Sequence, residues 1–301
     1  MHYCLIDDQG RKLGGAEMTL NAILDAAPHP VEVIATRELG TKIFDVNTIF
    51  ILGNIADINM DHLVQKKIID IVNNHCFFKI EFDYGFIPYR GMIPYRTYTG
   101  KEYKAEEHYG TMLWQFGKLI RDKAAGIFYM STEQLNIYDH HLGISSRKNK
   151  FHVLSSCFSE ESLTLMRQIR DSDQERNDCW MTVDGQDEWQ SFCKGLKEAV
   201  LFADNKKADI AVISTKTHED MLVAMGEYDT FVLLPNIHDT CPRTAIEAKL
   251  CGAEFIGNEN VQHSNEYWFK QDVESIDNYI SGRPKFFWET IHNDHYLSAV
   301  S

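Results

Sequence analysis

The sequence lacks the features that mark several common classes of protein. No apolar run reaches the roughly 18 residues that a membrane span needs, and His2 and Asp7 interrupt the N-terminus too early for a secretory signal peptide. No low-complexity tract occurs, and the apolar fraction of 44% is ordinary, which argues against a disordered chain. We therefore expect a globular protein that does not insert into a membrane.

Paired cysteines are also lacking. The seven cysteines are an odd number, are scattered along the chain and include no Cys-x-x-Cys pair. This arrangement argues against a disulfide framework and against a zinc module. A reducing compartment fits such a chain best, so we expect a cytoplasmic protein.

Positive charge is scarce in the second half of the 301-residue chain. Residues 1–150 hold 18 acidic and 17 basic residues, whereas residues 151–301 hold 26 acidic and 13 basic residues. The formal net charge of −14 argues against a general binder of polyanions. The nearly neutral first half can still meet an anionic partner, and the length suggests about two domains.

Short apolar segments alternate with helical patterns throughout the chain. The predicted strands are 3–6, 31–35, 48–52, 76–80, 126–130, 151–154, 179–183, 209–213, 230–234 and 254–257. The predicted helices are 16–26, 60–73, 109–124, 132–142, 160–169, 192–203, 217–225 and 242–250. Such alternation implies parallel sheets with helices on both faces. We predict an α/β fold of two Rossmann-like domains facing a central cleft, with ligands beyond the carboxyl ends of the strands.

The domain boundaries follow from this pattern. We place the first domain at residues 1–155 and the second at 156–265. An aromatic-rich tail, residues 266–301, is expected to pack back on the body.

A glycine pair precedes the first predicted helix. Gly14 and Gly15 allow close approach of a ligand to the backbone, and the N–H groups of the helix start favour an anion such as a phosphate. The loop matches neither the dinucleotide-binding fingerprint nor a Walker loop. A tight strand-to-helix turn explains the glycines equally well.

The segment 234–254 carries the strongest signal for chemistry. Pro242 is expected to be the first residue of a short helix, capped by Thr240 or Cys241. Asp239 precedes this helix and Glu247 lies within it, and carboxylates are good acceptors for vicinal sugar hydroxyls. Arg243 beside the helix start is suited to neutralise a diphosphate. Solvated charges on a well-capped surface helix are the ordinary alternative.

A third candidate is Lys194, which precedes Gly195 near the predicted start of a helix. The helix dipole disfavours a cation there, so a bound phosphate would justify it. A solvated lysine is the simpler interpretation.

Together these segments resemble the retaining glycosyltransferases of the two-Rossmann GT-B fold, in particular glycosyltransferase family 4. The matching residues are Gly14-Gly-Ala-Glu17, Lys194-Gly195 and the pair Asp239 and Glu247, seven residues apart, followed by Ala248-Lys-Leu-Cys-Gly252. They span nearly the whole chain in the order found in that family.

The resemblance implies a transfer of sugar from a nucleotide diphosphate sugar to an acceptor hydroxyl, with retention at the anomeric carbon. The implied donor-binding residues are Gly14, Gly15, Lys194, Arg243, Thr244 and Glu247. In the family the first acid of the pair, here Asp239, contacts the transferred sugar, and the second, here Glu247, holds the ribose. The commonest donor is a UDP-sugar, and neither a metal nor a cofactor is expected. The first domain would then be the acceptor side and the second the nucleotide-sugar side.

The chain departs from the family pattern at two points. Asp239 replaces the usual glutamate, which shortens its reach by one methylene, and no basic partner precedes Lys194. Both departures concern the affinity and identity of the donor.

The acceptor side is expected in the first half. Asp83 follows a predicted strand and is our candidate for a catalytic contact with the acceptor, although a loop-capping aspartate fits equally well. The stretch 84–104 interleaves aromatic and basic residues, and its prolines and glycines predict a loop. Together with Glu17, three residues of this stretch are the expected acceptor contacts: Tyr84, Arg90 and Arg96.

Aromatic rings and cations together are typical of nucleic-acid contacts and equally of sugar stacking. Small GT-B enzymes resembling this chain occur in tailed phages, where some glycosylate hydroxymethylated pyrimidines of phage DNA, acting in the host cytoplasm. We take such a base as one hypothesis for the acceptor and a saccharide as another. Two further alternatives are a GT-B epimerase, for which His238 and Asp239 would supply acid and base, and a non-catalytic binding protein.

Overall fold

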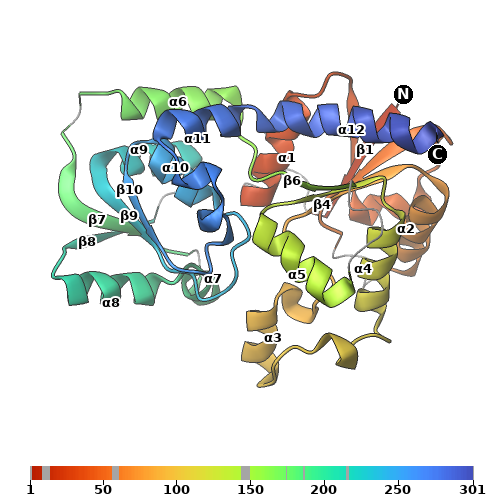
Figure 1. Ribbon diagram of the computed structural model, residues 1–301, viewed down its shortest axis with the longest axis horizontal. Helices are drawn as coiled ribbons and strands as arrows, with labels where there is room; N and C mark the ends of the chain where they lie inside the picture. Colours follow the sequence, from red (N-terminus) through yellow and green to blue (C-terminus); the bar gives the residue numbers. More distant parts are fainter. Residues whose placement is uncertain are drawn as a thin grey trace. The chain divides into compact units, whose positions relative to one another are not determined.

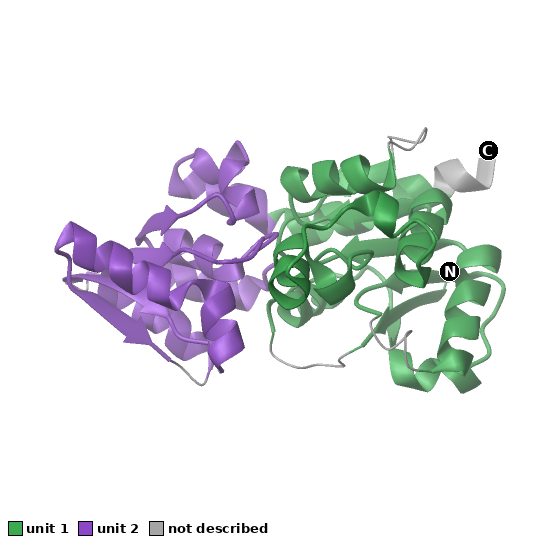
Figure 2. Cartoon of the chain, turned by 90° about the horizontal axis from the view of Figure 1, so that it is seen from below, with its two compact units in different colours: residues 1–157, 282–301 green, residues 158–281 purple. Residues whose placement is uncertain are grey.

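The chain forms two compact units. The computed structural model describes residues 2–8, 14–55, 61–143, 150–173, 175–185, 187–214 and 217–300. Unit 1 comprises residues 1–157 and 282–301, and unit 2 comprises residues 158–281 (Figure 2). The division after residue 157 lies two residues beyond the predicted boundary, whereas the predicted tail is shared between the units.

Unit 1 contains a six-stranded parallel sheet, sheet A, in the order β2-β1-β3-β4-β5-β6 (Figure 1). Its strands are β1 (His2–Asp7), β2 (Val31–Ala35), β3 (Thr48–Leu52), β4 (Phe77–Glu81), β5 (Gly126–Tyr129) and β6 (Phe151–Val153). Every residue of β3, β4 and β5 is buried. Burial on both faces explains why β3 and β5 read as nearly continuous apolar runs in the sequence, whereas β4 also buries Lys79 and Glu81.

The described helices of unit 1 are α1 (Gly15–Asp25), α2 (His62–Asn74), α3 (Met92–Thr99), α4 (Met112–Lys123), α5 (Thr132–Leu142) and α12 (Arg283–Val300). The last of these returns from the end of the chain to pack against α1. Trp288 Nε1 donates a hydrogen bond of 2.8 Å to the Ile23 carbonyl, and Asp294 pairs with His152 of β6 at 2.8 Å. The last part of the aromatic tail, helix α12, therefore packs into unit 1.

Unit 2 contains a four-stranded parallel sheet, sheet B, in the order β10-β9-β7-β8. Its strands are β7 (Asn177–Val183), β8 (Ile210–Ile213), β9 (Tyr228–Leu233) and β10 (Glu254–Gly257). Its helices are α6 (Glu160–Arg170), α7 (Glu188–Lys194), α8 (Leu196–Lys206), α9 (His218–Glu227), α10 (Arg243–Leu250) and α11 (Val273–Ser281). Helices α6, α9, α10 and α11 pack on one another over one face of the sheet, and α8 lies on the other (Figure 1).

Both sheets are wholly parallel among the strands described, and each is covered by helices. Both units thus have the α/β architecture predicted from the sequence. None of the helices described is both long and apolar enough to cross a bilayer.

Three local predictions were wrong. The stretch 84–104 is not a loop throughout, because α3 occupies residues 92–99. Pro94 lies in the first turn of that helix, where its missing N–H costs no hydrogen bond, and Gly100 ends the helix in the left-handed conformation. The predicted helix 192–203 is two helices, α7 and α8, separated by Gly195. Lys194 is therefore the last residue of α7 and not part of a first helical turn, and the dipole of α7 favours its charge there without a bound phosphate. Pro242 is the N-cap of α10 with extended backbone, rather than its first helical residue.

Candidate functional site

Polar side chains of unit 2 gather where the strands of sheet B end. Lys194 closes α7 after β7, His218 opens α9 after β8, and the segment after β9 supplies Asp239 and, within α10, Arg243 and Glu247. Because the strands are parallel, the segments that follow them lie at one edge of the sheet. The structure thus brings together four of the residues singled out in the second half of the sequence.

Lys194 and Asp239 form an ion pair. Lys194 Nζ lies 2.8 Å from Asp239 Oδ2. The Asp239 carboxylate raises the pKa of Lys194 against the effect of burial, and the charges of Cys193 and Glu247 act in the same direction. Lys194 is therefore a firmly charged group, as a ligand for a diphosphate needs to be.

Gly195 explains why a glycine follows this lysine. Its backbone has φ of +71°, and a Cβ added there would lie 1.7 Å from the Leu234 carbonyl oxygen. Only glycine permits so close an approach of α7 to the segment after β9. This packing holds Lys194 near the loop that carries Asp239.

Glu247 is the centre of a buried network. Its Oε1 lies 2.8 Å from His218 Nε2 and 3.3 Å from Arg243 Nε, and only 2% of the side chain is exposed. Burial raises the pKa of Glu247, but the hydrogen bond from His218 and the charge of Arg243 outweigh it, so the net pKa lies below its ordinary value. The guanidinium of Arg243 also stacks 3.8 Å from the ring centre of Phe158. Glu247 is thus a fixed, ionised carboxylate.

The start of α10 has the features expected of an anion site. Pro242 caps the helix without a side-chain hydrogen bond. Thr244 Oγ1 is buried and has no hydrogen-bond partner among the residues described. Backbone N–H groups, a hydroxyl and the Arg243 guanidinium therefore occupy the same turn.

His218 was missed by the sequence analysis. A predicted helix did begin at residue 217, and Thr217 accepts from the Asp220 N–H as its N-cap. The cap shows that residue 218 opens the helix that follows a predicted strand, a region where ligand-contacting residues gather. Its pairing with Glu247 depends on the order of strands in sheet B, which the sequence does not reveal.

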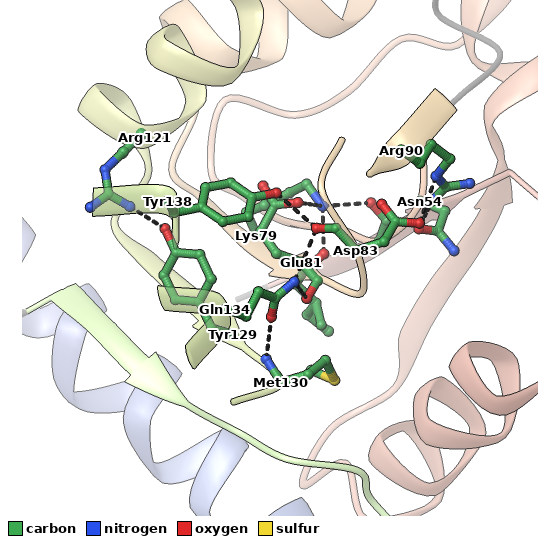
Figure 3. A network of polar contacts seen from close by, with 12 residues as sticks. Asn54, Lys79, Glu81, Asp83, Arg90, Arg121, Tyr129, Met130, Gln134 and Tyr138 are labelled. Atoms are coloured by element: carbon green, nitrogen blue, oxygen red, sulfur yellow. Dashed lines mark hydrogen bonds and ion pairs between the residues drawn. The ribbon is translucent and has the colours of Figure 1, made fainter. Parts of the chain in front are cut away.

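A second polar group lies at the carboxyl edge of sheet A in unit 1. The Asp7 carboxylate, at the end of β1, accepts a hydrogen bond of 2.8 Å from the Asn54 N–H after β3. Arg90 donates to Asn54 Oδ1 at 2.7 Å and pairs with Asp83 Oδ2 at 2.6 Å (Figure 3). Burial raises the pKa of Asp83, and the Arg90 charge only partly offsets this effect. Two predicted acceptor-side residues, Asp83 and Arg90, therefore contact each other directly.

A buried ion pair lies behind Asp83. Lys79 Nζ and Glu81 Oε2, two positions apart on the same face of β4, are 3.2 Å apart, with 6% and 10% of the side chains exposed. Burial raises the pKa of Glu81 against the nearby Lys79 charge. Tyr138 from α5 donates a hydrogen bond of 2.9 Å to the Asp83 carbonyl (Figure 3). The sequence signal that could have revealed this ion pair is the presence of Lys79 and Glu81 in a strand whose other residues are apolar.

These side chains line a cavity of about 160 Å³. Lys79, Glu81, Asp83, Arg90 and Tyr138 supply its polar wall. Apolar side chains form the rest of the lining, among them Ile55, Phe86, Ile87, Leu113 and Phe116. A concave site with a few convergent polar groups on an apolar wall is typical of small-ligand pockets.

The other predicted residues of unit 1 lie in different surroundings. Gly14 is the N-cap of α1, and the Glu17 carboxylate folds back over it. The approach is so close that a Cβ on Gly14 would lie 2.3 Å from Glu17 Oε2. Residues 9–13 of the glycine loop lie outside the described residues. Arg96 is exposed on α3 and pairs with Glu102 at 3.2 Å. Tyr84 is 1% exposed and stacks on Tyr138 inside the core, so its ring does not face an acceptor.

No set of three potential metal ligands occurs among the described residues. Below, the donor cluster denotes the polar group of unit 2 made up of Lys194, His218, Asp239, Arg243 and Glu247. The unit 1 cavity denotes the cavity lined by Lys79, Glu81 and Asp83.

No protein-family model and no curated protein matches the sequence. Solved structures do match the fold. Sucrose-phosphate synthase from Thermosynechococcus elongatus gives a TM-score of 0.56 at 12% identity, covering 97% of this chain and 94% of that chain. An alpha-glucosyltransferase in complex with UDP-glucose and DNA containing an abasic site gives 0.52 at 9% identity, covering 97% and 95%. An alpha-glucosyltransferase with UDP and a 13-mer DNA containing a HMU base gives 0.50 at 10% identity, covering 99% and 90%.

Identities this low establish the fold and nothing narrower, so the placement in family 4 stays a prediction. Nearly the whole of this chain is covered in each comparison. The chain therefore has the GT-B fold, two Rossmann-like units, that these glycosyltransferases share.

Proposed function

We propose that the protein is a retaining glycosyltransferase that moves a sugar from a UDP-sugar to an acceptor hydroxyl. One observation carries the proposal: Lys194, Asp239, Arg243 and Glu247 meet in one cluster at the carboxyl edge of sheet B. The fold supports it, since the alpha-glucosyltransferase structures with this fold contain UDP-glucose or UDP.

The donor cluster has a group for each part of a UDP-sugar. Lys194, Arg243 and the first N–H groups of α10, with Thr244, take the diphosphate. Asp239 receives the hydroxyls of the transferred sugar once Lys194 turns to the phosphate. Among the described residues, both ion pairs of Glu247 use Oε1, so we assign Oε2 to the ribose hydroxyls. For Gly14 and Gly15, at the start of α1, the donor-binding role that the resemblance implies stays a prediction.

The reaction requires no group beyond donor and acceptor. The bond from the anomeric carbon to the diphosphate oxygen breaks, and a bond to the acceptor oxygen forms on the same face of the sugar. The acceptor's proton passes to the leaving diphosphate. The protein contributes position and charge: cations of the donor cluster stabilise the charge that develops on the diphosphate.

We propose a hydroxymethylated pyrimidine of DNA as the acceptor. Two structures with this fold contain DNA, one of them with a HMU base. The unit 1 cavity presents Asp83 to accept a hydrogen bond from the acceptor hydroxyl, and Glu17, Arg90 and Arg96 are proposed to contact the rest of the acceptor. We propose a cytoplasmic location, since the scattered, unpaired cysteines suit a reducing compartment.

Glu247→Gln provides the direct test of the donor cluster. The substitution removes the charge that orients Arg243 and His218, and we expect the affinity for UDP to fall at least 10-fold, which corresponds to about 1.4 kcal/mol. Titration calorimetry with UDP measures the affinity. Release of UDP from UDP-glucose in the presence of an oligonucleotide with hydroxymethylated pyrimidines measures transfer.

Asp277→Asn is the matched control. Asp277 joins α11 to Arg167 of α6 at 2.8 Å, so its loss also removes a partly buried ion pair of unit 2, one that includes no residue of the donor cluster. This variant should lose stability and keep its affinity for UDP. Equal affinities of Glu247→Gln and wild-type protein would contradict the donor assignment. UDP binding without any transfer would favour a non-catalytic binding protein.

A further inference from the structure

Two tyrosines form an exposed stacked pair at the unit 1 cavity. The rings of Tyr89 and Tyr98 lie 4.8 Å apart between centres and at 24° to each other. The two residues are 54% and 57% exposed, and Tyr89 also lines the cavity. Exposed apolar surface of this kind is informative, because folding alone gains little from it.

The backbone beneath this pair is strained. Tyr89 and Arg90 are consecutive non-glycine residues in the left-handed region, each with φ of 60°. Such conformations persist only where surrounding contacts enforce them, and they gather at binding sites. Here Arg90 is held by Asp83 and Asn54. The strained corner thus presents one residue to the surface and anchors the next at the cavity.

Tyr98 is presented by a firmer element. It lies in the last turn of α3, which Gly91 and Gly100 delimit. The buried ring of Tyr95 supports the pair from the same helix, 6.5 Å from Tyr89. We call the stacked pair Tyr89 and Tyr98 the tyrosine platform. One of its residues adjoins the anchored Arg90, and the other belongs to helix α3.

Basic residues are frequent in the segment that carries the tyrosine pair, and three of them, Arg90, Arg96 and Lys104, each pair with one carboxylate. Residues 88–104 contain four basic residues and one acidic residue, Glu102. Arg96, two positions before Tyr98, is more than half exposed. A neutral saccharide needs only the rings, whereas a nucleic-acid strand needs rings for its bases and cations for its phosphates. The combination favours a nucleic acid.

Building on the proposed function, we infer that Tyr89 and Tyr98 form a stacking site for one unpaired base of a nucleic-acid acceptor. The base lies on the outer face of the tyrosine pair, beside the cavity that receives the reacting group. Because any base has a flat face, this site selects an unpaired strand rather than a sequence.

A fluorescent base tests the inference directly. The probe is a single-stranded oligonucleotide with one 5-hydroxymethylcytosine next to 2-aminopurine, whose fluorescence is quenched by stacking. Wild-type protein should quench it, and a duplex of the same sequence should bind more weakly. Loss of one stacked base costs about 5- to 150-fold in affinity, which we expect for Tyr98→Ala. Tyr98→Trp should restore binding.

Tyr109→Ala is the matched control. Tyr109 is 52% exposed and packs on Trp114 with ring centres 4.8 Å apart, outside the platform. Its loss should leave oligonucleotide binding unchanged. Equal effects of Tyr98→Ala and Tyr109→Ala, or binding without quenching, would overturn the inference, as would tighter binding of a neutral oligosaccharide that depends on Tyr98. Titration of wild-type protein with UDP separates the two proposals. UDP binding without oligonucleotide binding overturns the stacking site alone, and absence of UDP binding overturns the proposed function.

Discussion

Position 195 requires glycine for two separate reasons. Its positive φ costs a residue with a Cβ roughly 1–2 kcal/mol, and the Leu234 carbonyl occupies the place of that Cβ. A residue with a Cβ can be accommodated at this position only if α7 moves away from the segment after β9. Since Lys194 is the preceding residue, such a shift also breaks its contact with Asp239.

We expect Gly195→Ala to lower the free energy of unfolding by roughly 2–4 kcal/mol, combining the backbone cost with the clash. The affinity for UDP should fall as Lys194 is displaced. Urea unfolding and UDP titration measure the two effects.

Gly100→Ala separates the two causes. Gly100 also has a positive φ, of 69°, but nothing lies within 4 Å of an added Cβ. It should lose only the backbone part, and UDP affinity should not change. If both variants lost the same stability, the approach of Leu234 would not be the reason for glycine at position 195.

At the scale of elements, helix α12 binds the end of the chain to unit 1. Trp288 is 5% exposed, donates to the Ile23 carbonyl and meets the ring of Tyr3 edge-on at 5.3 Å. The sequence indicated that the aromatic tail packs on the body. It did not show that the tail divides, with α11 in unit 2 and α12 in unit 1, because both parts are rich in apolar residues.

Trp288→Ala should therefore destabilise unit 1 in particular. Loss of a buried tryptophan costs about 3–5 kcal/mol, and amide exchange in β1, β3 and α1 should accelerate. Exchange in the strands of unit 2 should change much less. Trp189→Ala, which removes a half-exposed ring from α7, is the control and should have a small effect on either unit.

Elements buried on both sides were the easiest to predict. Strands β3 and β5 carry apolar residues at almost every position, a pattern that depends only on local sequence. Helix α3 was missed because a proline is tolerated in the first turn, where it resembles a loop signal. The break between α7 and α8 was missed because the contact that makes Gly195 necessary comes from residue 234.

At the scale of the molecule, candidate sites could be predicted only in part. Lys194, Asp239, Arg243 and Glu247 stand in recognisable motifs, and the structure brings them together. Contacts that join separate elements, such as that of His218 with Glu247, depend on strand order. A single sequence gives no information on that order. The contacts around Lys79 in unit 1 could not be predicted for the same reason.

Acid should affect the two units differently. In unit 2, the ion pairs that hold Glu247 and Asp277 lower the pKa of both carboxyls. In unit 1, burial raises the pKa of Glu81 and Asp83. A carboxyl with a lowered pKa stabilises the fold above its ordinary pKa, and this stability is lost as the pH falls through the folded-state value. A carboxyl with a raised pKa has the opposite effect, since the folded state then takes up protons more readily.

We therefore expect unit 2 to unfold at a higher pH than unit 1 during acidification. Its loss of stability should begin as the pH falls below the ordinary values of 4.5 for glutamate and 3.8 for aspartate. Amide exchange, followed strand by strand from pH 6 downwards, resolves the two units. The double variant Glu247→Gln and Asp277→Asn should be less stable at neutral pH and lose less on acidification, because neither site can then take up a proton. Earlier unfolding of unit 1, or an unchanged pH dependence in the double variant, would show that other carboxyls govern the acid limit.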